Sequence, residues 1–315
     1  MTYPRSHLVD PVGGTYHVCS RCVRRSFLCG VDENSGRDFS HRREWIERRI
    51  LELSEIFSVS IYAYAVMSNH YHIVLSVESE TLTDVEVADK WLLLCPVKAK
   101  NTSQKYCHEA SKLAILGDSD RLAELRKRLR SLSWFMRFIN EPLARMANQE
   151  DRCKGRFWEG RFKSQILLDE ASVLACMVYV DLNPVRACIS SGPATSDFTS
   201  IQHRIRHCTV MHSLQQVKAI TVSKKQVPFA PISLSGYLKL LHWTKMSQSI
   251  RSHPLPIEVR HNLLTNHTST DEWFRDHMPE PDYWPRALGS IDTLREYARL
   301  IGQCWIKRRR RTVDH

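Results

Sequence analysis

The sequence SIYAYAVMSNHYHIVLSV, residues 60–77, decides the fold. Two runs rich in Ile, Val, Ala and Tyr flank a short polar break at residues 67–69, which predicts two antiparallel strands joined by a tight turn. Because side chains alternate along a strand, His70 and His72 should share one face and Tyr71 the other. Two imidazoles on one face can hold a metal ion, although two histidines on a half-buried strand would explain this motif alone.

A second informative stretch covers residues 169–187. Asp169 and Glu170 suit the start of a helix, and Pro184 suits its end. Tyr179 and Asn183 are four residues apart, so on a helix both would reach the same spot. Pro184 disfavours a helical conformation at Asn183, and a lone tyrosine is more often a core residue, so this geometry stays open. The apolar stripe of this helix consists of Val173, Leu174, Met177 and Val178.

Together these motifs resemble the single-tyrosine HUH transposases, and within them the REP-associated tyrosine transposases. The resemblance covers residues of about 10 to 190 and depends on several short motifs in the same order. The central residue of the His-x-His motif is usually aliphatic in that superfamily, whereas here it is Tyr71. The matching motifs are Gly14-Thr-Tyr-His-Val18, Ser20-Arg21-Cys22-Val23, Ala65-Val-Met-Ser-Asn-His-Tyr-His72, Gly155-Arg-Phe-Trp-Glu-Gly-Arg-Phe-Lys-Ser164 and Tyr179-Val-Asp-Leu-Asn183-Pro184.

The resemblance implies a transposase that cuts and rejoins single-stranded DNA at hairpin-forming repeats. Tyr179 would be the catalytic nucleophile and would form a 5′-phosphotyrosine link. His70, His72 and Asn183 would hold a divalent metal ion, Mg²⁺ or Mn²⁺. The implied fold is the HUH endonuclease fold, an α+β fold with a ferredoxin-like antiparallel sheet.

The order of the first elements favours the same fold class. A strand is expected over residues 15–20 and a helix over 40–57, followed by the His-x-His hairpin. Strand, helix, strand, strand is the opening of a ferredoxin-like sheet. We expect helices to pack on one face of this sheet and to leave the other face free for a ligand.

The sequence divides into two parts. We expect an HUH domain over residues 1–190, with a largely helical insertion at about 78–130, in which a helix starts near residue 120. Pro142 should break or kink the following helix near Glu141. Residues 191–315 are expected to form a partly helical C-terminal extension that includes helical patches at 234–243 and 291–305 and ends in a basic tail at 307–311.

The charge balance favours an anionic partner. The 315 residues have a formal net charge of +11 and a pI near 9.2, so nucleic acid is the first candidate. Solvated surface positions are the alternative interpretation of each basic cluster. The predicted DNA-binding residues are Arg21, Arg24, Arg25, Arg156, Arg161 and Lys163.

Cysteine usage and the N-terminus predict a reducing, cytoplasmic location. The ten cysteines are scattered, and the pair Cys19 and Cys22 lacks a second pair at zinc-finger spacing. Reduced thiols are therefore the favoured interpretation over a zinc site. The first residues have no apolar signal region, and no apolar run reaches membrane-spanning length.

Three other functions fit parts of the pattern. A replication initiator would share the chemistry, whereas a plasmid relaxase usually places its tyrosine before the histidines. A hairpin-binding regulator without cleavage would keep the DNA partner and lose the reaction. An RNA-binding ferredoxin-like domain is the third alternative. The resemblance also allows a homodimer.

Overall fold

The computed structural model describes residues 13–23, 28–32, 36–78, 82–97, 104–207, 220, 232–247, 277–279 and 283–306. Arg24, Arg25 and the basic tail at 307–311 lie outside these residues. No helix within the described ranges is both long enough and apolar enough to cross a membrane.

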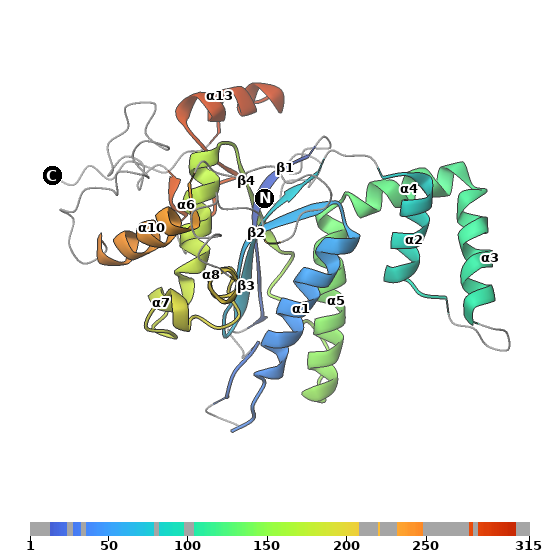
Figure 1. The fold of residues 1–315 in the computed structure, drawn as a ribbon, viewed down its shortest axis with the longest axis horizontal. Helices are drawn as coiled ribbons and strands as arrows, with labels where there is room; N and C mark the ends of the chain where they lie inside the picture. Colours follow the sequence, from blue (N-terminus) through green and yellow to red (C-terminus); the bar gives the residue numbers. More distant parts are fainter. Residues whose placement is uncertain are drawn as a thin grey trace.

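A five-stranded sheet forms the centre of the structure (Figure 1). Its order is β2-β3-β1-β4-β5, and neighbouring strands are antiparallel except for the parallel pair β4–β5. The predicted hairpin and first strand are therefore confirmed. The strands are β1 (Gly14–Arg21), β2 (Val59–Val66), β3 (His70–Val77), β4 (Lys163–Leu167) and β5 (Ala287–Leu288).

Helices α1 (His41–Ile56) and α5 (Leu132–Glu150) cover one face of the sheet. Their apolar side chains pack on every second residue of the strands, such as Tyr16 and Val18 of β1 and Tyr71 of β3. Burying this face is the main driving force for the central fold, since each fully buried large apolar side chain contributes about 1.5–3 kcal/mol.

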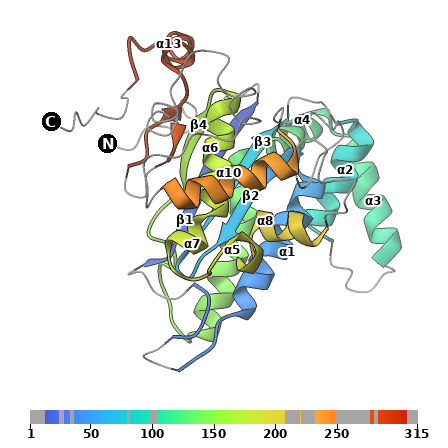
Figure 2. The same cartoon turned by 60° about the vertical axis from the view of Figure 1, so that its left-hand side comes forward.

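The second face is not free, so the prediction of helices on one face only was wrong. Helix α6 (Glu170–Asp181) packs on β2 and β3, where Ala63 and Ala65 leave room for a close approach. All side chains from Ser172 to Asp181 are buried, and a helix that is apolar on all sides must be covered on all sides. Helix α10 (Leu234–Ser247) supplies the outer cover (Figure 2).

Side-chain caps set several helix boundaries. Asp169 accepts a hydrogen bond from the backbone N–H of Ser172 at 2.8 Å and starts α6, as predicted. The expected break at Pro142 does not occur, because α5 continues through Pro142 to Glu150, while a kink at this position stays a prediction. A proline at this position cannot donate to the carbonyl of Phe138, and Arg49 Nε donates to that carbonyl instead, at 3.3 Å.

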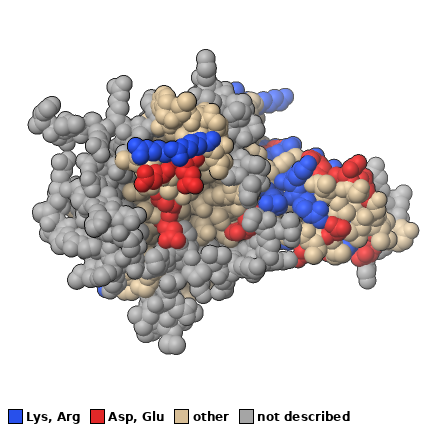
Figure 3. Space-filling model, turned by 90° about the horizontal axis from the view of Figure 1, so that it is seen from above, with Lys and Arg blue, Asp and Glu red and all other residues tan. Residues whose placement is uncertain are grey.

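The predicted insertion contains three helices, α2 (Asp84–Leu94), α3 (Gln104–Leu116) and α4 (Ser119–Leu129). They share a small apolar cluster that includes Trp91, Leu122 and Leu125. Figure 3 shows basic and acidic side chains intermixed over this region, and ion pairs such as Arg126–Asp84 account for part of that mixture. Helix α4 ends in the basic residues Arg126, Lys127 and Arg128. Since Arg126 and Arg128 form ion pairs on the surface, this run is largely a solvated, paired surface.

Parts of the predicted C-terminal extension pack on the central sheet. Strand β5 pairs with β4, and α13 (Ile291–Leu300) follows it. The expected helical patches correspond to α10 and α13, while the domain boundary near residue 190 stays a prediction. Between α6 and α10 lie α7 (Asn183–Arg186), the 3₁₀ turn η3 (Pro193–Thr195) and α8 (Ser200–Arg206).

A buried carboxylate joins three of these helices. Asp181, the last residue of α6, has no solvent-exposed surface. It accepts hydrogen bonds from Ser200 Oγ, from the backbone N–H of Ile201 at 3.0 Å and from Tyr237 Oη at 2.6 Å. Arg204 lies 3.9 Å away. Because buried charge is costly unless it is paired, this network fixes α8 and α10 against α6.

We expect Asp181→Ala to lower the stability of the folded protein by about 3–5 kcal/mol, the usual cost of removing one partner from a buried charged network. Thermal unfolding followed by circular dichroism measures this effect. Asp292→Ala is the matched control, since the Asp292 side chain is 93% exposed. Equal melting temperatures for the two variants would contradict the assigned role of Asp181.

Candidate active site

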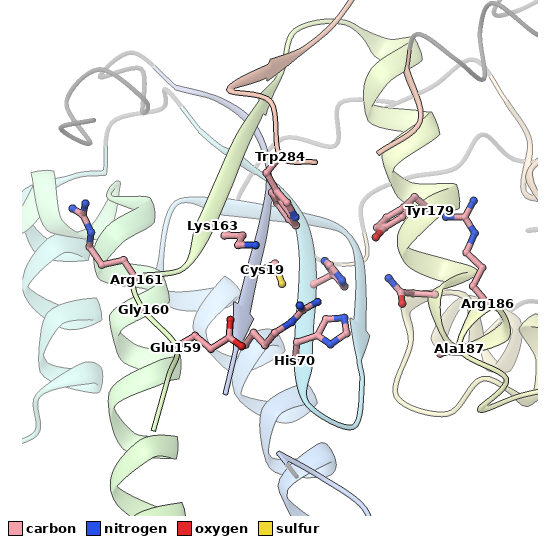
Figure 4. A pocket seen from close by; sticks show the side chains of 13 residues that line it. Cys19, His70, Glu159, Gly160, Arg161, Lys163, Tyr179, Arg186, Ala187 and Trp284 are labelled. Atoms are coloured by element: carbon pink, nitrogen blue, oxygen red, sulfur yellow. The ribbon is translucent and has the colours of Figure 1, made fainter. Parts of the chain in front are cut away.

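A cavity of about 420 Å³ opens between the second face of the sheet and the C-terminal half of α6 (Figure 4). Strands β1, β3 and β4 supply its floor, α6 and α7 supply one wall, and Trp284 lies above the floor. The cavity is lined by Cys19, Arg21, His70, His72, Glu159, Gly160, Arg161, Lys163, Tyr179, Asn183, Arg186, Ala187 and Trp284.

The structure brings most of the predicted site residues to this one cavity. The candidate nucleophile and the three candidate metal ligands all line it, and their roles stay predictions. Arg156 is not among its lining residues, and its side chain donates to the carbonyl of Glu159 at 3.4 Å. The predicted residues that line the cavity are Arg21, His70, His72, Arg161, Lys163, Tyr179 and Asn183.

Strand alternation places His70 and His72 on the same face of the sheet, as the sequence predicted. Tyr71 and Ile73 belong to the core under α1 and α5, so His70 and His72 face the cavity. Their ring centroids are 4.8 Å apart, and the rings are nearly perpendicular. The ring of His72 also lies 5.8 Å from that of Tyr179.

Each of these histidines is held through its Nδ1 atom. His70 Nδ1 lies 2.5 Å from Asn69 Oδ1, and His72 Nδ1 lies 3.0 Å from Nε2 of His17. His72 Nε2 is buried and has no hydrogen-bond partner among the described residues. A metal-binding histidine typically uses one ring nitrogen for the ion and the other for such an orienting contact. The Nε2 atoms of His70 and His72 are thus suited to bind a ligand in the cavity.

Burial keeps these rings neutral. It lowers the pKa of His70 to about 4, with a further lowering by Arg21 and Lys163. Burial is also the main reason that the pKa of His72 lies well below its usual value. Neutral imidazole is the form that binds metal ions.

Tyr179 and Asn183 approach each other despite Pro184. Helix α6 ends at Asp181, and the short helix α7 starts at Asn183, so the backbone direction is kept and the predicted proximity is observed. Burial raises the pKa of Tyr179 to about 12, while Arg186 and a hydrogen bond from Asn183 act to lower it. The Arg186 guanidinium lies 5.1 Å from the centre of the Tyr179 ring. The phenol is therefore protonated at neutral pH and lies next to a positive charge.

The sequence did not single out three residues that contact Tyr179 or His72 in the structure, which are His17, Arg186 and Trp284. Arg186 follows Tyr179 by seven residues, a spacing that could have placed it on the same helical face. His17 lies in the matching motif at residues 14–18. Strand alternation could have placed its side chain on the face of the sheet that Tyr16 does not use. No sequence signal pointed to Trp284, which stacks 4.6 Å from the ring of His17.

The thiols near Cys19 are buried in the structure. Burial raises the pKa of Cys19 to about 12 and that of Cys22 to about 11, so both thiols are protonated. Within the described ranges, no group of three or more His, Cys, Asp or Glu side chains could hold a metal ion. The candidate ion site therefore depends on the amide of Asn183 as its third donor.

No family model and no curated protein matches this sequence. A search of solved structures matched a chain described as a REP-associated tyrosine transposase bound to a REP hairpin. The match has a TM-score of 0.40 and 12% sequence identity, and it covers 74% of this chain and 99% of the other.

We expect the buried histidines to make stability depend on pH. The folded protein leaves His17 neutral until its pKa of about 3, set by burial, whereas an unfolded chain protonates histidine near pH 6.5. Stability should therefore fall as the pH is lowered from 7. At about 1.4 kcal/mol per pH unit, His17 accounts for about 2 kcal/mol between pH 6.5 and 5.

Urea unfolding at several pH values measures this loss in the wild type and in His17→Asn. The variant should lose less stability than the wild type over this range, because it lacks one of the buried groups. His242→Asn is the control, since His242 lies on an exposed position of α10. The same pH dependence in the wild type and in His17→Asn would show that His17 is not a buried neutral group.

Proposed function

We propose that the protein is a transposase that cuts and rejoins single-stranded DNA at hairpin-forming repeats through a 5′-phosphotyrosine intermediate. The observation that carries the proposal is one cavity that holds a phenol, two oriented imidazoles and an amide. Tyr179 supplies the phenol, His70 and His72 the imidazoles, and Asn183 the amide. The strand order β2-β3-β1-β4, with its antiparallel pairs, agrees with the ferredoxin-like sheet expected for this class.

The donor set suits a divalent cation. His72 Nε2 is a buried nitrogen that has no hydrogen-bond partner in the described part of the chain. Because His70 Nδ1 contacts Asn69, the Nε2 atom of His70 stays available for an ion. The Asn183 side chain donates to Tyr179, so its amide oxygen stays available as an acceptor. A bound Mg²⁺ or Mn²⁺ ion would polarise the scissile phosphate and offset the charge that develops on it.

Tyr179 is the proposed nucleophile. Its oxygen forms a bond to phosphorus, the bond from phosphorus to the 3′ oxygen of the neighbouring nucleotide breaks, and that oxygen leaves with a proton as a 3′-OH. The phenol proton must leave during attack, because burial raises the pKa of this tyrosine to about 12. Arg186 and Asn183 stabilise the phenolate. The phosphodiester is conserved in the covalent link, so the strand can be rejoined.

Basic side chains around the cavity suit a phosphate backbone. The Arg21 Nε atom is buried and has no hydrogen-bond partner among the described residues. Lys163 lies at the start of β4 beside Trp284, with its Nζ 5.8 Å from the ring centre. Arg161 extends away from Tyr179 (Figure 4) and would contact DNA outside the cavity. Trp284 is half-buried, and a cation next to an aromatic ring is a common way to hold a single strand.

A cleavage assay tests the proposal. Purified protein is mixed with labelled single-stranded hairpin DNA from its genomic flanks, with Mn²⁺ or with EDTA, and run on a denaturing gel. We expect a protein-linked DNA band with Mn²⁺ and none with EDTA. Tyr179→Phe should abolish the band, and His70→Ala should reduce it by about 100-fold or more, the usual cost of losing one electrostatic contribution.

Tyr106→Phe is the matched control, since Tyr106 is 68% exposed on α3, and it should leave cleavage unchanged. Equal cleavage by Tyr179→Phe would contradict the nucleophile assignment. Hairpin binding on a native gel without a covalent band under any metal ion would instead support a regulator that does not cleave DNA.

A further inference from the structure

Three buried polar side chains form a chain of hydrogen bonds behind the cavity. Gln165 Nε2 lies 2.9 Å from His17 Nδ1, and His17 Nε2 lies 3.0 Å from His72 Nδ1. His17 is fully buried, and Gln165 and His72 are each 2% exposed. This series of hydrogen bonds begins at Gln165, which does not line the cavity, and ends at His72, one of the candidate ion ligands.

The sheet fixes this arrangement. His17 of β1 lies directly opposite Gln165 of β4, and Cys19 of β1 lies opposite His72 of β3. His17 is therefore diagonal to His72 on the same face. Trp284 stacks on His17 at 4.6 Å with an interplanar angle of 27°. Strand pairing and this stacking thus place the three side chains in a row on one face of the sheet.

Among the described residues, the two end atoms of this hydrogen-bonded series have no hydrogen-bond partner. His72 Nε2 and Gln165 Oε1 are both buried without a hydrogen bond among the described residues. Gln165 offers its amide N–H₂ to His17, so His17 carries its proton on Nε2 and donates to His72 Nδ1. A neutral His72 then carries its own proton on Nε2, the atom that faces the cavity. In this state His72 can donate a hydrogen bond there, but it cannot bind a cation.

Turning the Gln165 amide by 180° reverses the chain. Oε1 then accepts from His17 Nδ1–H, His17 Nε2 accepts from His72 Nδ1–H, and His72 Nε2 keeps a lone pair toward the cavity. The turn needs almost no space, because the amide oxygen and nitrogen have nearly the same shape. It changes no net charge, so it is compatible with a buried site.

We propose that His17 and Gln165 are positioning residues that set the ring tautomer of His72, and thereby decide whether the site binds a divalent cation. The inference rests on the proposed function, since it assumes that His72 is an ion ligand. In the ion-bound state the protons would lie on His72 Nδ1 and His17 Nδ1, and Gln165 would accept. In the ion-free state the protons would lie on His72 Nε2 and His17 Nε2, and Gln165 would donate.

Calorimetric titration with Mn²⁺ tests this inference. Gln165→Leu removes the acceptor that the ion-bound state needs, so the Mn²⁺ affinity should fall about 10- to 100-fold, the range seen for such orienting partners. Gln165→Glu keeps the acceptor and removes the N–H₂ donor that the ion-free state uses, so it should bind Mn²⁺ at least as tightly as the wild type. Gln149→Leu, on an exposed position of α5, is the control for the substitution itself.

A second readout does not depend on these variants folding. In wild-type protein labelled with ¹⁵N-histidine, NMR identifies which ring nitrogen of His17 carries the proton. We expect the proton on Nε2 without metal and on Nδ1 with saturating Mg²⁺.

Two outcomes would overturn the inference alone. They are equal Mn²⁺ affinities for the wild type and Gln165→Leu, and a His17 proton that stays on Nε2 when Mg²⁺ is bound. The failure of the proposed function would look different, because the wild type would then bind no more Mn²⁺ than His70→Ala.

Discussion

Strand β3 carries two sets of side chains that cannot be moved independently, because its residues alternate between the faces of the sheet. Tyr71, Ile73 and Leu75 fill the core under α1 and α5, which forces His70 and His72 onto the opposite face. A shift of one residue in register would exchange both sets. Formation of the apolar core therefore also aligns the two histidines, and the candidate active site depends on the same strand pairing as the fold.

One part of the second face of the sheet packs against α6, and a neighbouring part carries the candidate site residues. Where β2 and β3 present Ala63, Ala65 and Val74, α6 packs closely and is buried on all sides. Next to that contact, His17, His72 and Tyr179 approach one another with ring centroids 5–6 Å apart. The buried carboxylate of Asp181 fixes the end of α6 close to Tyr179. Rigid packing thus holds the candidate reactive groups, as a preorganised site requires.

The sequence was informative where local patterns determine structure. Strand alternation predicted the facing of His70 and His72, and the Asp169 cap marked the start of α6. It could not show that α6 covers the second face, because α6 is apolar on all sides and a helical pattern gives no direction for such a helix. The helix does not break at Pro142 for a related reason, since Arg49 from another helix donates to the carbonyl that the proline cannot reach. Trp284 reaches the cavity through the pairing of β4 with β5, a long-range contact that no local motif records.

The most direct test of the central claim is to identify the residue that becomes linked to DNA. Protein incubated with a single-stranded hairpin and Mn²⁺ is digested with protease and nuclease, and its peptides are mapped by mass spectrometry. If Tyr179 is the nucleophile, a 5′-linked nucleotide should be found on the peptide that contains it and on no other tyrosine. A nucleotide linked to a different residue, or cleaved DNA without any linked peptide, would contradict the account.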